Sequence, residues 1–244
     1  PCTVIGNGTN LLVGDKGIRG LVISVGGGMQ NCLIDGDTVY AQAGILMSKL
    51  SHRILNAELS GFEALSGIPG TLGGGIYMNA GAYLSDISNV LEKIEVLDEN
   101  QNIRTIDKKD LDYSYRNSLL MKKKWIVLKA YLKLTKSNKK DLIDLIEDRK
   151  MRRVKSQPLE YPSAGSVFRN PEGMYAGKLI EDCNLKGYNH GGGEISSKHA
   201  NFIINKKDAT SKDIKHLMDL AHDEVLKKYD IDLHREQELF NWEK

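Results

Sequence analysis

The sequence has few of the features that mark several large classes of protein. It contains three cysteines, Cys2, Cys32 and Cys183, among 244 residues. They are odd in number, widely spaced and without neighbouring metal-ligand residues, which favours a reducing compartment and a structural role. No apolar run approaches the roughly twenty residues that a membrane-spanning helix needs, and no basic-then-apolar segment opens the chain. These absences predict a cytoplasmic protein with no membrane association and no metal site.

An excess of charge of one sign is also missing. The chain has 34 Lys and Arg against 32 Asp and Glu, a formal net charge of +2. This balance gives no electrostatic basis for binding nucleic acid. The basic run Lys122–Lys124 beside Trp125 fits a solvated turn before a strand. With 41% hydrophobic and 27% charged residues, the composition is that of an ordinary soluble protein, long enough for one large domain or two to three small ones.

Glycine, in contrast, is concentrated in a long central segment, Ser60–Tyr83. It has glycines at 61, 67, 70, 73, 74, 75 and 81, one proline and almost no charge. A flexible linker is one interpretation, but the interleaved Ile68, Leu72 and Ile76 are residues that pack. We therefore favour an ordered cradle whose backbone approaches a phosphate or cofactor closely.

A second glycine cluster, residues 6–10, follows the apolar run Cys2–Ile5, which is expected to be a strand. The third glycine of a dinucleotide-binding fingerprint would fall on Leu11, and no clear amphipathic helix follows. The segment is instead a glycine turn with small hydroxyl and amide side chains, suited to binding phosphate through backbone N–H groups.

Periodicity predicts the remaining elements. Alternation of Ile126, Leu128, Ala130, Leu132 and Leu134 predicts a strand with these side chains on one face. The Thr210-x-x-Asp213 pattern predicts a capping box at the start of the last helix. Other strands are expected at residues 21–25, 39–42, 94–97 and within the tail 233–240, and other helices at 46–55, 139–154 and 175–183.

Motifs spread over nearly the whole chain resemble the UDP-N-acetylenolpyruvoylglucosamine reductase family. They are GNGTNLL at 6–12, SGIPGTLGG at 66–74, MNAGAY at 78–83, YRNS at 115–118, PSAGSVF at 162–168 and AGKLIE at 176–181. The resemblance implies FAD-dependent reduction of UDP-N-acetylglucosamine-enolpyruvate to UDP-N-acetylmuramate, with NADPH as hydride-donating co-substrate. It places this flavoprotein oxidoreductase in peptidoglycan precursor synthesis, and so in cell-wall biogenesis, cell shape and cell division.

The resemblance also implies a fold, α+β (mixed α/β), with an FAD-binding domain of the PCMH/VAO-like class, a central sheet domain and an inserted C-terminal substrate domain. We expect a remnant of the FAD-binding domain at 1–20, a central FAD-binding domain at 21–155 plus 230–244, and a substrate-binding domain at 156–229. The chain resembles the shorter subclass of the family, which lacks a tyrosine-bearing loop, and is expected to lack an N-terminal βα segment.

The chemistry needs a hydride donor, stabilisation of an enolate-like intermediate and a proton donor. Side chains supply no hydride, which implies flavin. The resemblance implies Arg116 and Glu236 as the residues that stabilise charge, and Ser166 as the proton donor. Glu238 competes with Glu236 for this role, because the family has Glu-Val before an apolar strand, whereas this chain has Arg235-Glu-Gln-Glu238. A serine is a poor acid on its own and needs neighbours that stabilise its alkoxide or relay a proton.

The resemblance further implies two binding sets. Cofactor-binding residues are Gly6, Asn7, Gly8, Thr9, Asn10, Ser66, Gly67, Ile68, Pro69, Gly70, Thr71, Gly73, Gly74, Asn79, Ala80, Gly81 and Ala82. Substrate-binding residues are Tyr115, Asn170, Lys178, Lys186 and His199. The partner is a small molecule, and the oligomeric state is left open. Two alternatives stay open as well: another flavin oxidoreductase of the same fold, and a non-catalytic fragment that binds a nucleotide sugar or flavin.

Overall fold

The structure, a computed structural model that describes residues 1–242, divides into two units. The first unit comprises Pro1–Gly8 and Leu21–Met151, and the second comprises Thr9–Gly20 with the described residues from Arg152 on. Each unit has a hydrophobic core of its own. Helix α3 (Lys139–Ser156), which fits the helix expected at 139–154, runs from one unit into the other.

The two units differ from the expected domains, most of all at residues 9–20 and in the tail from residue 230. Strand β16 (Glu238–Phe240) pairs in parallel with β2 (Leu11–Val13), and both strands belong to the second unit. The expected partition placed residues 230–244 with the central sheet and residues 9–20 with the first domain. The hydrogen-bonded pairing of β2 with β16 draws both segments into the second unit, so the chain enters that unit twice.

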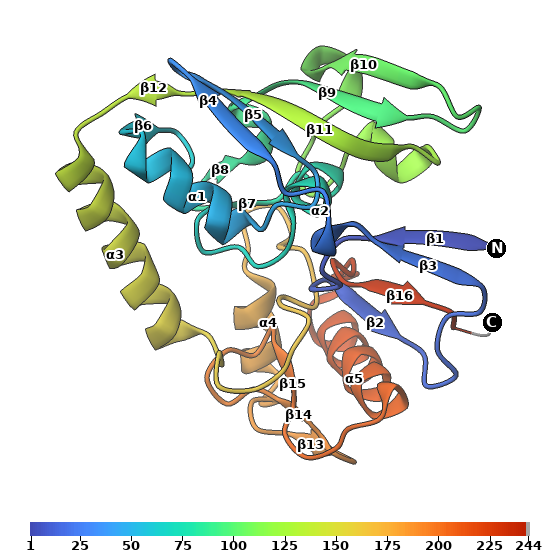
Figure 1. The fold of residues 1–244 in the computed structure, drawn as a ribbon. Helices are drawn as coiled ribbons and strands as arrows, with labels where there is room; N and C mark the ends of the chain where they lie inside the picture. Colours follow the sequence, from blue (N-terminus) through green and yellow to red (C-terminus); the bar gives the residue numbers. More distant parts are fainter. Residues whose placement is uncertain (243–244) are drawn as a thin grey trace. The chain divides into compact units, whose positions relative to one another are not determined.

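The first unit is built on a five-stranded antiparallel sheet (Figure 1). Its order is β10 (Ile103–Asp107), β9 (Leu91–Leu97), β11 (Ile126–Lys133), β5 (Thr38–Gln42) and β4 (Cys32–Asp35). Helices α1 (Met47–Asn56) and α2 (Leu72–Tyr77) lie on one face of it. Alternating residues such as Val39, Ile94 and Ala130 are fully buried, whereas Tyr40 and Tyr131 make an edge contact, with ring centroids 5.2 Å apart, and stay half-buried.

The expected alternation along β11 is wrong in its first half. Val127 is buried, while Ile126 and Leu128 are only half-buried. A register shift between Val127 and Lys129 inserts one residue opposite β9. Such a bulge reverses the face that later residues occupy, so Ala130 and Leu132 point into the core as expected although Leu128 does not.

Several short elements complete the first unit. Strand β1 (Cys2–Ile5) pairs in parallel with β3 (Leu21–Ser24), and the pairs β6–β12 and β7–β8 are antiparallel. The short strands are β6 (Leu59–Ser60), β7 (Gly81–Ala82), β8 (Ser85–Asp86) and β12 (Thr135–Lys136). Four 3₁₀ turns lie at Val25–Gly27 (η1), Ile87–Asn89 (η2), Lys108–Leu111 (η3) and Leu119–Lys122 (η4).

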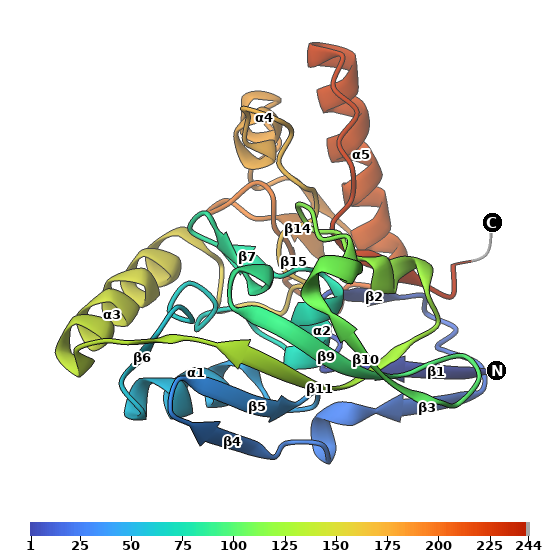
Figure 2. The same cartoon turned by 90° about the horizontal axis from the view of Figure 1, so that it is seen from above.

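In the second unit, a three-stranded antiparallel sheet packs against helix α5 (Ser211–Tyr229) (Figure 2). The strands are β13 (Asn189–His190), β14 (Gly193–Ile195) and β15 (Ile203–Asn205), and α4 (Ala176–Asp182) also contacts α5. The predicted capping box is confirmed: Thr210 Oγ1 accepts from Asp213 N at 3.2 Å, and Asp213 Oδ2 accepts from Thr210 N at 2.9 Å.

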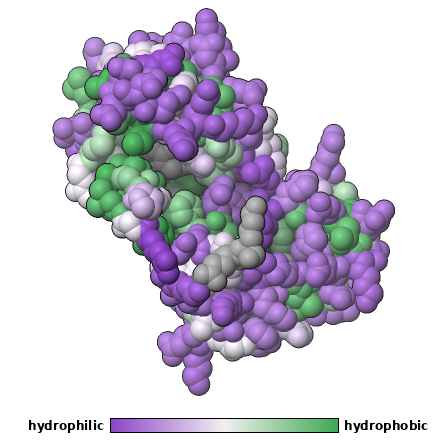
Figure 3. Space-filling model, turned by 90° about the vertical axis from the view of Figure 1, so that its right-hand side faces the viewer, coloured by the Kyte–Doolittle hydropathy of each residue, from purple (hydrophilic) through white to green (hydrophobic). Residues whose placement is uncertain are grey.

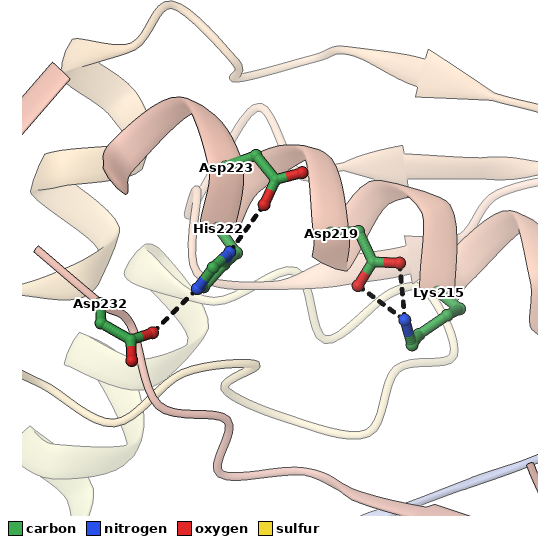
Figure 4. Close-up of polar contacts among 5 residues, drawn as sticks. All are labelled: Lys215, Asp219, His222, Asp223 and Asp232. Carbon is green, nitrogen blue, oxygen red and sulfur yellow. Dashed lines mark hydrogen bonds and ion pairs between the residues drawn. The ribbon is translucent and has the colours of Figure 1, made fainter. Parts of the chain in front are cut away.

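One histidine on α5 ties the helix to the segment that follows it. His222 Nδ1 lies 2.8 Å from Asp223 Oδ1, and its Nε2 lies 2.9 Å from Asp232 Oδ1 (Figure 4). The hydrogen bonds to Asp223 and then Asp232 raise the pKa of His222. Two turns earlier, Lys215 pairs with Asp219 at 2.6 Å on the same helix. The imidazole therefore links Asp232, in the segment that follows α5, to the helix.

The described residues contain no membrane span, metal-ligand cluster or disulfide. Within residues 1–242, no helix is long and apolar enough to cross a membrane. In the same range no group of His, Cys, Asp and Glu could hold a metal ion, and all three cysteines are free thiols. The face shown in Figure 3 is mostly hydrophilic, with hydrophobic patches between.

Candidate functional site

The two glycine clusters meet at Thr71 in the first unit. A Cβ on Gly6 would lie 2.4 Å from Thr71 Oγ1, so only glycine fits where the first turn crosses the second cluster. Ser24 Oγ donates to Gly6 O at 3.3 Å, and a Cβ on Gly26 would lie 3.5 Å from Thr71 Cγ2. Three turns that are distant in sequence thus converge on one threonine.

Helix α2 forms in spite of its glycines because tertiary contacts hold it. Glycine is a poor helix former, yet Thr71 Oγ1 caps the helix by accepting from Gly74 N at 3.3 Å. Gly73 N donates to Ala43 O at 2.8 Å, and a Cβ on Gly73 would lie 2.9 Å from Ala43 Cβ. Gly74 faces the other way: it is exposed, and its Cβ would meet only Thr71 Oγ1, at 3.5 Å.

The cofactor candidates therefore fall into groups of different exposure. Asn7, Gly8, Gly67, Pro69 and Gly74 are exposed, whereas Gly6, Ser66, Ile68, Gly70, Gly73, Gly81 and Ala82 are half-buried and Thr71, Asn79 and Ala80 are buried. Thr9 and Asn10 belong to the second unit, where Asn10 Nδ2 donates to Glu236 O at 3.0 Å. Gly74, exposed beside Thr71, gives the kind of backbone surface that a cradle for phosphate requires.

Arg116 lies in a tight turn of the first unit. Ser114 and Asn117 exchange backbone hydrogen bonds of 3.2 and 3.1 Å, which leaves Tyr115 and Arg116 at the tip. Arg116 has φ 53°, a left-handed conformation that is costly for a residue with a side chain. Its Nη2 donates to Gly81 O at 2.5 Å and its Nη1 to Asn79 O at 3.4 Å. The backbone of the glycine-rich segment thus orients the guanidinium plane.

Two more side chains fasten this turn to the same segment. Tyr113 OH donates to Ile76 O at 3.2 Å, and Ser118 Oγ donates to Tyr77 O at 2.6 Å. Burial, and to a smaller extent the charge of Asp86, raises the pKa of Tyr113, so the phenol stays neutral and keeps its donor. Ser118 is fully buried. Together these bonds anchor both ends of the Tyr115-Arg116 turn along residues 76–81.

Ser166 and Glu236 lie on adjacent backbone segments of the second unit. Ser166 forms an antiparallel bridge with Phe202, and Glu236 N donates to Val167 O at 2.8 Å. Glu238 lies in β16 instead, where its N–H donates to Asn10 O at 2.9 Å. The buried Asn201 fixes the serine segment further, because its carboxamide accepts from Phe168 N at 3.0 Å and donates to Phe168 O at 2.8 Å.

Four substrate candidates lie on helix α4 or make contacts with it or the residues around it. Asn170 Oδ1 accepts from Ala176 N at 3.1 Å, at the start of the helix. A Cβ on Gly177 would lie 3.0 Å from the His199 ring, which explains the glycine in AGKLIE. Lys178 Nζ lies 2.6 Å from Asp182, and Lys186 Nζ lies 3.4 Å from Glu181. The fifth candidate, Tyr115, lies in the first unit, with its ring against the Arg116 guanidinium at 5.0 Å.

His199 is a neutral structural acceptor in this cluster. Its pKa is lowered, chiefly by burial. Its Nδ1 accepts from Asn201 N at 3.2 Å, and its ring meets Phe202 edge-on, with centroids 4.9 Å apart. Asn201 has no signal in the sequence, because nothing in His199-Ala200-Asn201 distinguishes a buried amide from a solvated one. Tyr113 and Ser118 could have been predicted from the sequence, because Ser118 is part of the YRNS motif and Tyr113 lies two residues before it.

Comparisons with known proteins agree with this architecture. Residues 157–240 match the profile for the C-terminal domain of UDP-N-acetylenolpyruvoylglucosamine reductase, and residues 1–107 match the profile of an FAD binding domain. A crystal structure of UDP-N-acetylenolpyruvylglucosamine reductase from Thermus caldophilus superposes with a TM-score of 0.86 at 34% identity, covering 98% of this chain and 85% of that chain. The expected mixed fold with an FAD-binding domain is confirmed.

Curated relatives give the same result. UDP-N-acetylenolpyruvoylglucosamine reductase of Caldanaerobacter subterraneus subsp. tengcongensis is 48% identical over 96% of this chain and 77% of its own length. The enzyme of the same name from Clostridium tetani is 45% identical over 97% of this chain and 76% of its own length. Identity of this extent over nearly the whole chain confirms the resemblance first indicated by the motifs, and the chain belongs to the UDP-N-acetylenolpyruvoylglucosamine reductase family.

Proposed function

We propose that the protein reduces UDP-N-acetylglucosamine-enolpyruvate to UDP-N-acetylmuramate with FAD and NADPH, a step of peptidoglycan precursor synthesis. The observation that carries this proposal is 48% identity over 96% of the chain to a relative named for this reductase activity. The match of residues 1–107 to an FAD binding domain supports the cofactor independently. The proposed partner is a small molecule, because the substrate is a nucleotide sugar. We also propose a cytoplasmic location.

The residues of the first unit fit a flavin cofactor. Bound flavin would supply the hydride transfer that side chains cannot provide. The exposed backbone at Gly74, beside Thr71, and at Asn7 and Gly8, which directly follow Gly6, is proposed to hold its pyrophosphate. Gly8 has φ 69°, and a Cβ at this position would have no atom within 4 Å, so the turn presents open backbone there.

Arg116 is proposed to bind the enolpyruvyl carboxylate. That carboxylate gains negative charge as the enolate-like intermediate forms, and a guanidinium in fixed orientation stabilises it without reorganising. The contacts of Arg116 with Gly81 O and Asn79 O support this role, because they set the orientation before substrate arrives. The left-handed backbone at Arg116 is the kind of local strain that clusters at functional sites.

Ser166 is proposed to donate the proton, and Glu236 to assist in stabilising the intermediate. The hydrogen bond from Glu236 N to Val167 O supports Glu236 over Glu238, because it places the Glu236 backbone next to the serine segment, whereas the Glu238 backbone pairs with Asn10 and β2. Lys178 and Lys186 are proposed to bind the substrate diphosphate as point charges. In the structure these lysines pair with the carboxylates of Asp182 and Glu181. Binding of the diphosphate would therefore replace each of these ion pairs with one to a phosphate.

Purified protein tests the proposal directly. Flavin absorbance in the protein, with NADPH oxidation that depends on UDP-N-acetylglucosamine-enolpyruvate, is the expected result. NADPH oxidation that is equally fast without this substrate would favour another flavin oxidoreductase of the same fold. A colourless protein that binds the nucleotide sugar without turnover even after incubation with FAD would favour the non-catalytic alternative.

A further inference from the structure

Asn79 links the arginine turn to the glycine-rich segment through both its side chain and its backbone. It is 1% exposed and has φ 45°, two residues after the end of α2. Its Nδ2 donates to Ser114 O at 2.9 Å, and its Oδ1 accepts from Ser88 N at 3.3 Å. Its own carbonyl accepts from Arg116 Nη1 at 3.4 Å. One buried residue therefore touches the turn, the guanidinium and the 3₁₀ turn η2.

We propose that Asn79 is a positioning residue for Arg116 and not a contact of the flavin. This inference rests on the proposed function, in which Arg116 binds the enolpyruvyl carboxylate. A carboxamide that is 1% exposed, with its amide nitrogen and its oxygen both bonded to protein backbone, is committed to the fold. The resemblance implies that Asn79 contacts the cofactor, whereas its hydrogen bonds connect it to the arginine turn.

The chemistry of the contact requires an amide. Ser114 O already accepts from Asn117 N at 3.1 Å to close the turn, and the Asn79 amide adds a second donor to the same carbonyl. Aspartate at position 79 has nearly the same volume but lacks this donor and would face a carbonyl with a negative charge. Ser88 N also donates to Asp86 Oδ1 at 3.1 Å, so Ser88 keeps an acceptor if Asn79 Oδ1 is lost. The contact from Asn79 Nδ2 to Ser114 O is the one that reaches the arginine turn.

Loss of this contact should move Arg116 without dismantling the turn. Tyr113 and Ser118 still bond Ile76 O and Tyr77 O, and they hold the two flanks of the turn. A shift of roughly 1 Å in a group that positions substrate can slow chemistry by about a hundredfold. The expected effect is therefore on the reaction with the enolpyruvyl substrate and not on flavin retention.

The test compares Asn79→Asp and Asn79→Ala with a matched control, Asn89→Asp. Asn89 lies in η2 of the same segment, is exposed, and donates from Nδ2 to Ser85 Oγ at 3.3 Å, away from the arginine turn. Three quantities are measured: flavin bound per chain, flavin reduction by NADPH, and reoxidation of reduced flavin by UDP-N-acetylglucosamine-enolpyruvate. We expect both Asn79 variants to keep flavin and its reduction by NADPH. Their reoxidation should slow by about tenfold to a hundredfold, while the control matches the parent chain.

A double-mutant cycle separates positioning from a general structural defect. If Asn79 acts through Arg116, then Asn79→Asp added to Arg116→Ala should change reoxidation by less than about twofold, because the group it orients is gone. A full additional loss in that background would overturn the inference. So would loss of flavin from Asn79→Asp with unchanged reoxidation per bound flavin, since this would make Asn79 a cofactor contact. If Asn79→Ala does not fold, the near-isosteric Asn79→Asp decides. A parent chain whose reduced flavin ignores the enolpyruvyl substrate would instead overturn the proposed function and this inference with it.

Discussion

Neighbouring glycines of helix α2 should respond oppositely to the same substitution. A Cβ on Gly73 would lie 2.9 Å from Ala43 Cβ and 3.2 Å from Ala43 O, well inside the roughly 3.5–4.0 Å at which carbon atoms pack. The bond from Gly73 N to Ala43 O, at 2.8 Å, prevents the helix from moving aside. Gly74 has only Thr71 Oγ1 at 3.5 Å, an ordinary contact.

The expected magnitude follows from two contributions. Replacing glycine by alanine within a helix favours folding by up to about 1 kcal/mol at either position. Forcing an extra methyl group into a packed contact costs about 1–3 kcal/mol, and only Gly73→Ala incurs this cost. The helix contribution is common to both variants, so Gly74→Ala should exceed Gly73→Ala in free energy of unfolding by about 1–3 kcal/mol.

Urea unfolding of the flavin-free protein measures this difference. Trp125 lies in the first unit and Trp242 in the second, so a Trp242→Phe background makes the fluorescence report on the unit that contains α2. Equal transition midpoints, or a lower midpoint for Gly74→Ala, would refute the packing argument. Flavin binding gives the second half of the test: Gly74→Val should lose flavin if Gly74 faces the cofactor, and full flavin occupancy would remove Gly74 from the cradle.

Three further predictions concern the second half-reaction and the pH dependence of stability. Ser166→Ala should leave flavin reduction by NADPH nearly intact and slow reoxidation by substrate about a hundredfold or more, as stopped-flow absorbance would show; reoxidation at the parent rate would remove this serine as proton donor. Arg116→Lys should slow reoxidation by about tenfold to a hundredfold, because an ammonium cannot reproduce a bidentate contact; a rate within twofold of the parent would contradict that contact. The raised pKa of His222 means that its ion pairs stabilise the second unit fully below the unfolded value of about 6.5 and are lost as pH rises through the folded pKa. The urea midpoints at pH 6 and pH 9 should therefore differ less in His222→Gln than in the parent. The control Lys215→Gln removes a neighbouring ion pair but no imidazole, and should keep the parent difference. Identical pH differences in the parent and in His222→Gln would refute the histidine contribution.

The sequence predicted local features more reliably than pairings. The capping box at Thr210 and the α3 helix depend on residues within a few positions of one another, and both are found. The tail was expected to return as a strand, and β16 does form, but its partner β2 lies more than two hundred residues away. No local pattern encodes that partner, because strand pairing depends on which edge the rest of the fold leaves available.

The site shows the same limit. The motifs identified Arg116, but not the left-handed backbone that presents it or the carbonyls of Asn79 and Gly81 that orient it. The motifs also imply Gly67, Gly70, Gly73, Gly74 and Gly81 as cofactor contacts. In the structure Gly73 is needed for packing against Ala43, and a Cβ on Gly81 would lie 2.4 Å from Ser85 O across its own hairpin. A motif records that glycine is required; the surrounding atoms show why.

A single-turnover experiment tests the proposed reductase activity most directly. The flavin-loaded protein is reduced anaerobically with one equivalent of NADPH and then mixed with UDP-N-acetylglucosamine-enolpyruvate, while flavin absorbance is followed by stopped flow. We predict that oxidised flavin returns in a rapid phase with formation of UDP-N-acetylmuramate, and that UDP-N-acetylglucosamine, which lacks the enolpyruvyl group, gives no such phase. Flavin that stays reduced with the enolpyruvyl substrate and is reoxidised only when oxygen is admitted would contradict the proposed function.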